Sequence, residues 1–312
     1  MTDENSLQYP GRWAAEFPDR PAIVMTGSGE TMTYGELDAE ANRISRLFRS
    51  LGIQAGDHVA FCLENRIEFL AVAWGAHYAG LYYTAISSRL TADEIAYIVD
   101  DCVARALVTS PYKSDAVAEI NAATPSVEAR FPLVGHVEGH ACFEDAVAAQ
   151  SSEPLTDRTE GQDMLYSSGM TGRPKGVKSP MSDQGLGAGN SITMMAEALF
   201  GATPGSVYLS PAPLYHAAPL RFCLGAHRLG CTVVAMERFD AESALAAIQE
   251  HEVSWSQWVP TMFVRMLKLP EEVRAGYDVS SLIAAVHAAA PCPVAVKHRM
   301  IEWWGPVLHE YY

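Results

Sequence analysis

The chain has 312 residues, of which 49% are apolar and 19% charged, and this composition predicts a large packed core. Lysine and arginine total 22 against 37 acidic residues, so the net charge of −15 argues against nucleic acid or an anionic membrane as a general partner. The length suits one large domain or two sub-domains that share an interface.

The start of the chain, its cysteines and one apolar run bear on the cellular compartment. The start is acidic and polar without a signal peptide, and the six cysteines show no C-x-x-C pair, so we expect a reduced, cytoplasmic protein. Residues 69–88 lack Asp, Glu, Lys and Arg over a membrane-spanning length of 20 residues. Their glycines and polar residues favour a buried helix to about Ala79, a break at Gly80 and a buried strand from Leu81 to Ile86. No transmembrane segment is therefore expected.

Helical and strand patterns alternate along the chain. Two helix starts carry a capping box, Thr33 with Glu36 and Thr91 with Glu94. Further strands are expected at residues 57–63, 105–110, 164–167, 207–210, 231–236, 253–258, 282–287 and, buried, 307–311, and helices at 241–250 and 293–304. The alternation predicts an α/β fold with two mostly parallel sheets covered by helices. The polar stretch 148–162 is the expected boundary between sub-domains 1–150 and 151–312.

The sequence YSSGMTGRPKGV, residues 166–177, gathers hydroxyls, glycines and one lysine directly after a strand. Ligands of open α/β sheets lie beyond the carboxyl ends of strands, and glycine-rich loops offer backbone N–H groups to anions. Ser167, Ser168 and Thr171 add hydroxyl donors and Lys175 adds a positive charge, so the loop suits a polyphosphate. Its spacing is not that of a G-x-x-x-x-G-K loop. A polar surface turn explains any three or four of these residues, but not all twelve in this order.

The motif resembles the phosphate loop of the adenylate-forming superfamily, which contains acyl-CoA synthetases, luciferases and the adenylation domains of peptide synthetases. Four later segments resemble the same family in order and spacing: PLYHAAPL (213–220), VPTMF (259–263), HAAAPCP (287–293) and HEYY (309–312). The resemblance covers nearly the whole chain. It implies the large N-terminal domain of this fold, with the small C-terminal domain absent from the chain.

The resemblance also implies which residues bind the nucleotide. The phosphate loop would contribute Ser167, Ser168, Gly169, Met170, Thr171, Gly172 and Lys175. The adenine would lie against Ala288, Ala289, Ala290 and Pro291 and against Glu310, Tyr311 and Tyr312, with Tyr312 as the stacking ring. Met170 stands where the family commonly has threonine, which removes one hydroxyl donor from the loop.

A further set of residues is implied for acid binding and catalysis. The expected catalytic residues are Lys175, His216 and Thr171, and the expected acyl-binding residues are His216, Trp258 and His287. A histidine bonded to a backbone carbonyl is the alternative for His216, and a structural role is equally open for His287. Trp255 and Trp258 are three apart on a strand and should face opposite sides, with Trp255 in the core.

The implied activity is that of an acyl-CoA ligase, which uses ATP, Mg²⁺ and coenzyme A to convert a carboxylic acid to a thioester through an acyl-adenylate. No metal ligand of this chain is expected, because the family's magnesium carboxylate and catalytic lysine would follow Tyr312. We therefore expect a truncated form that makes no thioester alone. The alternatives are transfer to a carrier-protein thiol and a non-catalytic nucleotide- or acyl-binding module. The sequence does not specify the acid and leaves a homo-oligomer open.

Overall fold

The computed structural model describes residues 7–133, 140–167, 173–182 and 185–311. Contacts divide the chain into two compact units: the first contains Gly35–Ala188 and Leu214–Ala217, and the second contains Gln8–Tyr34, Gly189–Pro213 and Ala218–Tyr312. This division differs from the sub-domain boundary expected at residue 150. The reason is that residues 162–167 and 175–178 form strands of the sheet of the first unit, although they follow the polar stretch.

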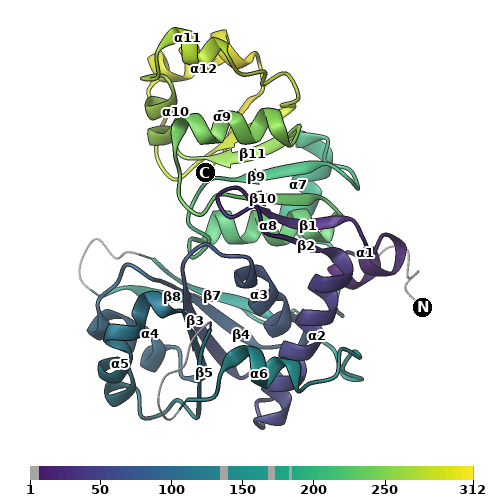
Figure 1. The fold of residues 1–312 in the computed structure, drawn as a ribbon, viewed down its shortest axis with the longest axis vertical. Coiled ribbons are helices and arrows are strands. Elements are labelled where there is room, and N and C mark those ends of the chain that lie inside the picture. The colour runs from purple at the N-terminus through teal and green to yellow at the C-terminus, as the bar shows by residue number, and fades with distance from the viewer. Residues whose placement is uncertain (1–6, 134–139, 168–172, 183–184, 312) are drawn as a thin grey trace. The chain divides into compact units, whose positions relative to one another are not determined.

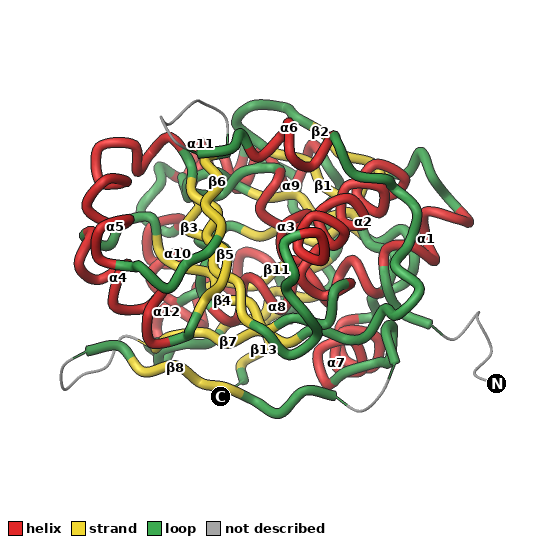
Figure 2. Tube along the Cα trace, turned by 90° about the horizontal axis from the view of Figure 1, so that it is seen from below, coloured by secondary structure: helices red, strands yellow, loops and turns green. Residues whose placement is uncertain are grey.

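The first unit is built on a six-stranded sheet flanked by helices. Its strands are β3 (His58–Leu63), β4 (Tyr82–Ser87), β5 (Ala104–Thr109), β6 (Ala129–Pro132), β7 (Gln162–Ser167) and β8 (Lys175–Lys178). Its helices are α2 (Tyr34–Ser50), α3 (Glu68–Tyr78), α4 (Ala92–Asp101), α5 (Val117–Ala123) and α6 (Phe143–Ala148), with a 3-10 helix at Pro111–Ala116. The strand order is β6-β5-β3-β4-β7-β8, and Figure 2 shows β3, β4 and β5 side by side in yellow. Neighbouring strands are parallel except for the antiparallel hairpin of β7 and β8.

Successive residues of β3 face two different helical layers. Cys62 lies in an apolar cluster with Ile95 of α4, on the face that α4 and α5 cover. Phe61 points the other way, and its ring meets that of Phe69 in α3 at a centroid distance of 5.1 Å. Figure 1 shows α4 and α5 on one side of this sheet and α3 on the other. Both faces are therefore buried, as expected for a parallel sheet.

The apolar run 69–88 folds as the sequence predicts. It forms α3 and β4, and Gly80 between them has a φ of +67°, which favours glycine. The capping box of α4 is also present, since Thr91 Oγ1 accepts from the Glu94 N–H at 3.4 Å and Glu94 Oε2 accepts from the Thr91 N–H at 2.9 Å. In the part of the chain that the structure describes, no helix is long and apolar enough to cross a membrane.

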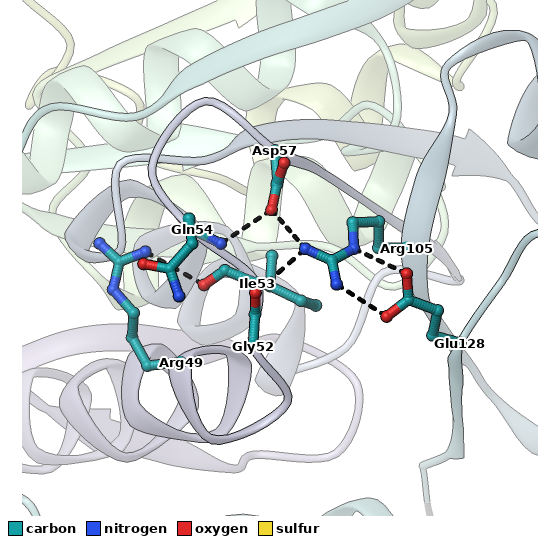
Figure 3. Close-up of polar contacts among 7 residues, drawn as sticks. All are labelled: Arg49, Gly52, Ile53, Gln54, Asp57, Arg105 and Glu128. Atoms are coloured by element: carbon teal, nitrogen blue, oxygen red, sulfur yellow. Dashed lines mark hydrogen bonds and ion pairs between the residues drawn. The ribbon is translucent and has the colours of Figure 1, made fainter.

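Arg105 of β5 ties three segments of the first unit together (Figure 3). Its Nη1 lies 2.6 Å from Asp57 Oδ2 and donates to the Gly52 carbonyl at 3.0 Å, so it fixes the turn between α2 and β3. Its Nε and Nη2 donate to the two carboxylate oxygens of Glu128 at 2.9 and 2.7 Å. Bidentate pairs of this kind restrict the relative orientation of the two side chains more than single ion pairs do.

The second unit is built on a seven-stranded sheet. Its strands are β1 (Pro21–Met25), β2 (Thr31–Thr33), β9 (Val207–Ser210), β10 (Thr232–Ala235), β11 (Trp255–Trp258), β12 (Ala284–His287) and β13 (Leu308–Glu310). Its helices are α1 (Pro10–Glu16), α7 (Ser191–Phe200), α8 (Ala217–Arg228), α9 (Ala241–Glu250), α10 (Pro260–Met266), α11 (Glu271–Ala275) and α12 (Val294–Trp304). The order is β13-β12-β11-β9-β10-β1-β2, and only β1 and β2 pair antiparallel.

Two features of this sheet differ from the sequence prediction. The strand expected to be buried at 307–311 is β13, which is only partly buried because it is an edge strand with β12 as its single neighbour. Strands β1 and β2 were not predicted, although residues 22–25 form a short apolar run; β2 has only three residues and shows no pattern of its own. They add the N-terminal segment to the sheet of the second half of the chain.

The buried His227 of α8 should make the stability of this unit depend on pH. Its Nε2 lies 3.1 Å from the Ala22 carbonyl oxygen, and burial lowers its pKa to about 4. Because the unfolded chain takes up the proton below about pH 6.5, this contribution is complete above that pH and is lost as the pH falls toward 4. Between pH 7 and pH 5 the loss should be about 2 kcal/mol.

His227→Gln keeps an N–H donor and has no titrating group, so its unfolding free energy should fall by about 2 kcal/mol less over this range. Urea denaturation of both proteins at pH 7 and pH 5 measures the difference. Equal losses would show that His227 has the same pKa in the folded protein as in the unfolded chain.

Candidate functional site

The flanks of the proposed phosphate loop form the hairpin of β7 and β8. Ser167 pairs with Lys175 and Tyr166 pairs with Gly176, and Ser167 and Lys175 are both exposed. A Cβ at Gly176 would lie 2.5 Å from the Met164 methyl carbon, so a larger residue here would have to displace that flexible side chain. Strand β8 was not predicted, because the motif after β7 was interpreted as a loop. Five predicted residues lie outside the described residues: Ser168, Gly169, Met170, Thr171 and Gly172.

Helix α4 anchors both flanks of the loop. The Tyr166 hydroxyl donates to Asp101 Oδ2 at 2.5 Å, and burial, followed by this hydrogen bond, raises the pKa of Tyr166. The Tyr97 hydroxyl donates to the Pro174 carbonyl at 3.2 Å, and the Arg173 guanidinium lies over the Tyr97 ring at 4.9 Å. These contacts hold the hairpin while the side chains of Ser167 and Lys175 stay exposed, with the Ser167 hydroxyl donating to the Lys175 carbonyl at 3.5 Å.

A buried glutamate holds the base of the same hairpin. Glu160, just before β7, places Oε1 3.0 Å from His77 Nδ1 and accepts from the Gly187 N–H at 3.1 Å through Oε2. The other ring nitrogen of His77 lies 2.9 Å from the Tyr83 hydroxyl. A Cβ at Gly161 would come within 2.7 Å of the His77 Cα, so only glycine permits this approach. No periodic pattern predicted this cluster of Glu160, His77, Tyr83 and Gly187, because its members come from four separate segments.

The segment that carries His216 packs with the first unit, although its chain neighbours belong to the second. The Leu214 N–H donates to Oδ1 of the buried Asn65 at 2.8 Å, and Asn65 follows β3. His216 is exposed, and its ring centroid lies 4.3 Å from that of Tyr215. Partial desolvation, followed by the positive charge of Arg89, lowers the pKa of His216. His216 is therefore held at the carboxyl edge of the first sheet.

In the second unit, His287 and Glu310 pair in register at the ends of β12 and β13. His287 is completely buried, and its Nδ1 lies 3.8 Å from Glu310 Oε1. Lys297 of α12 forms an ion pair with Glu310 Oε2 at 2.5 Å. Burial is the main cause that lowers the pKa of His287, which the Glu310 charge opposes and the Lys297 charge supports.

The segment after β12 contains the residues predicted to contact adenine. Ala288 is buried, whereas Ala289, Ala290 and Pro291 are exposed. Ala289 has a φ of +73°, a left-handed conformation that costs a non-glycine residue roughly 1–2 kcal/mol. The fold therefore supports a strained and exposed turn at the carboxyl end of a parallel strand, which is where ligands of such sheets lie.

The two tryptophans of β11 face opposite sides of the sheet, as predicted. Trp255 packs against Tyr208 at a ring centroid distance of 4.4 Å. Trp258 lies in the apolar cluster on the α9, α10 and α12 face, 5.6 Å from Trp304, and its Nε1 donates to Ser256 Oγ. A role of Trp258 in acyl binding remains a prediction.

The remaining aromatic site residue is Tyr311, which directly follows β13. Its ring stacks on Phe222 of α8 at a centroid distance of 5.9 Å and an interplanar angle of 30°. Burial raises the pKa of Tyr311. Tyr312, the expected adenine-stacking residue, lies outside the described residues.

The chain is similar in sequence to several known proteins. A family model described as "AMP-binding enzyme" matches residues 11–312. The chain is 28% identical over 291 residues to "4-coumarate--CoA ligase-like 9" of Oryza sativa subsp. japonica, covering 90% of this chain and 51% of that protein. It is 27% identical over 286 residues to "Long-chain-fatty-acid--CoA ligase FadD13" of Mycobacterium tuberculosis, covering 89% and 54%. The chain thus spans about half the length of the curated relatives it matches.

A solved structure shows the same fold. The N-terminal domain of FACL13 from Mycobacterium tuberculosis superposes with a TM-score of 0.81 at 22% identity, covering 96% of this chain and 73% of that one. The two mostly parallel sheets flanked by helices are therefore those of the N-terminal domain of the adenylate-forming fold, as the sequence predicted. Because the family model covers almost the entire chain, the protein belongs to the AMP-binding enzyme family.

Proposed function

We propose that this chain is the acid-activating part of an acyl-CoA ligase. The observation that carries the proposal is the pairing of Ser167 with Lys175 at the carboxyl end of β7. This pairing places a hydroxyl and an ammonium group opposite each other within the twelve-residue motif. Both groups suit the oxygens of a polyphosphate, which need donors and positive charge where negative charge develops.

In the proposed reaction, a carboxylate oxygen of the acid attacks the α-phosphorus of ATP, and the bond to pyrophosphate breaks. The sulfur of coenzyme A then attacks the acyl carbon, loses its proton and displaces AMP. Lys175 and Ser167, with the loop residue Thr171, would bind phosphate oxygens, and His216 would orient the acid's carboxylate. Ala288–Pro291, Glu310 and Tyr311 would bind adenine, and His287 and Trp258 would contribute to acyl binding.

Magnesium is part of the proposed chemistry, because Mg²⁺ neutralises phosphate oxygens in such transfers. The described residues contain no group of three His, Cys, Asp or Glu side chains that could hold a metal ion. We therefore assign no ligand of this chain to Mg²⁺. The acceptor thiol and a cytoplasmic location are likewise parts of the proposal.

The test is acid-dependent ATP–pyrophosphate exchange, measured with the 312-residue chain and with any longer natural form of it. The acid panel should include 4-coumarate, ferulate and long-chain fatty acids, which are named in the titles of its relatives. We expect at least one acid to raise exchange above the acid-free rate, and coenzyme A to give its thioester only in the longer form. ATP binding without acid-dependent exchange in either form would favour a non-catalytic binding module.

A further inference from the structure

Three parallel strands of the first unit end side by side. Leu63 of β3 pairs with Ser87 of β4, so both strands end at the same level. Strand β7 pairs with β4 through Tyr82–Gln162 and Tyr83–Asp163, and this register, continued along the strands, brings Ser167 to the level of Ser87. The start of the phosphate loop therefore lies beside the residues that directly follow β4.

Arg89 stands two residues after the end of β4, at this same edge of the sheet. It is exposed, and its backbone N–H donates to Ser87 Oγ at 3.2 Å, which fixes the local turn. Within the described part of the chain, its guanidinium has no hydrogen-bond or ion-pair partner. Other arginines of this unit are engaged: Arg105 binds two carboxylates, and Arg66 pairs with Glu68 at 2.7 Å.

The segment with His216 reaches the same edge. Asn65, two residues after the end of β3, binds the Leu214 N–H, so residues 214–217 lie over the ends of β3 and β4. Arg89 follows β4 at this edge, and its positive charge contributes to the lowered pKa of His216. Arg89, His216 and the end of β7 therefore surround one region of the first unit.

We propose that Arg89 binds an anionic oxygen group in this region, either the carboxylate of the acid or a phosphate of the nucleotide. A guanidinium without a described partner, at the sheet edge shared with the His216 segment and the end of β7, matches the planar arrangement of carboxylate and phosphate oxygens. The net charge of −15 makes a local cation at this edge more important for attracting an anion. This inference rests on the proposed function, because it assigns a ligand to the same site.

The first test examines the geometry and needs no ligand. NMR titration of His216 in the wild-type chain and in Arg89→Ala should show a higher His216 pKa in the variant, because a nearby positive charge has been removed. Arg43→Ala is the matched control, since Arg43 lies on α2 of the same unit and pairs only at the surface with Glu40. An unchanged His216 pKa in Arg89→Ala would place Arg89 too far away and overturn the proposal.

The second test identifies the anion. Calorimetry should measure the Kd of four probes: Mg·ATP, AMP, adenosine and the free acid that supports exchange in the panel above. The proteins compared are the wild type, Arg89→Ala, Arg89→Lys and Arg43→Ala. If Arg89 binds phosphate, Arg89→Ala weakens Mg·ATP binding about tenfold and leaves adenosine unchanged. If Arg89 binds the acid, only the affinity for the acid falls to a similar extent. Arg89→Lys should recover part of either loss, because lysine keeps the positive charge but cannot form a bidentate contact.

The outcomes separate this inference from the proposed function. Equal affinities of Arg89→Ala and Arg43→Ala for all four probes would overturn the role of Arg89 while the proposed function stands. A wild-type chain that binds neither nucleotide nor acid would instead overturn the proposed function, and the inference with it.

Discussion

Substitution of Lys175 with alanine should slow ATP–pyrophosphate exchange about 10- to 100-fold with little change in melting temperature. The Lys175 side chain is exposed, and among the described residues its ammonium group has no partner, so its loss removes no core packing. A charged hydrogen bond to phosphate contributes about 1.5–3 kcal/mol, which gives the expected range. Exchange at saturating acid and nucleotide, together with a thermal melt, measures both effects.

Lys178 provides the matched control on the same strand. Its Nζ lies 2.9 Å from His58 Nε2 and 4.4 Å from the centre of the Tyr82 ring, so its role is in packing. Lys178→Ala should lower the melting temperature and leave exchange nearly unchanged. If Lys175→Ala exchanges as fast as the wild type, the loop is not part of the mechanism.

Replacement of Glu160 by alanine should lower the stability of the first unit by about 3 kcal/mol. The change removes a buried carboxylate that binds both His77 and the Gly187 N–H, and it leaves those groups buried. Urea denaturation of the variant and the wild type gives the difference in unfolding free energy.

Glu160→Gln tests whether the hydrogen bonds of Glu160 or its negative charge stabilise the base of the hairpin. Glutamine keeps an acceptor for the Gly187 N–H and loses the negative charge beside His77, so its loss should be smaller than that of the alanine variant. A loss below about 1 kcal/mol for Glu160→Ala would mean that the hairpin base is held by its backbone contacts alone.

Much of the fold was predictable from local patterns. The strand at 207–210 and the helix at 241–250 occur with the predicted bounds, and the capping box at Thr91 is formed. These elements have clear alternation, helical periodicity or capping signals of their own. The division into units was not predictable, because β7 joins the first sheet by pairing with β4, which lies about 80 residues earlier in the chain.

The candidate site shows the same contrast. The twelve-residue motif pointed to Ser167 and Lys175, because its unusual residues lie next to one another in the sequence. The supporting residues could not be found in this way. Asn65 contacts Leu214, and Glu160 contacts His77 and Gly187, and such pairs are set by sheet order and not by spacing in the sequence. Asn65 and Glu160 are common polar residues, and no local sequence pattern distinguishes them from surface residues.

The position of β8 at the edge of the six-stranded sheet has a consequence for the behaviour of the protein at high concentration. An edge strand exposes unpaired backbone N–H and C=O groups, to which a strand of a second molecule can add. Lys175 and Lys178 stand at the two ends of β8, with the exposed Val177 between them. Two lysines of one molecule would meet two of another, and their repulsion opposes fibril-like pairing. The lysine proposed for phosphate binding would thus also protect the protein against aggregation, which restricts the residues that can replace it.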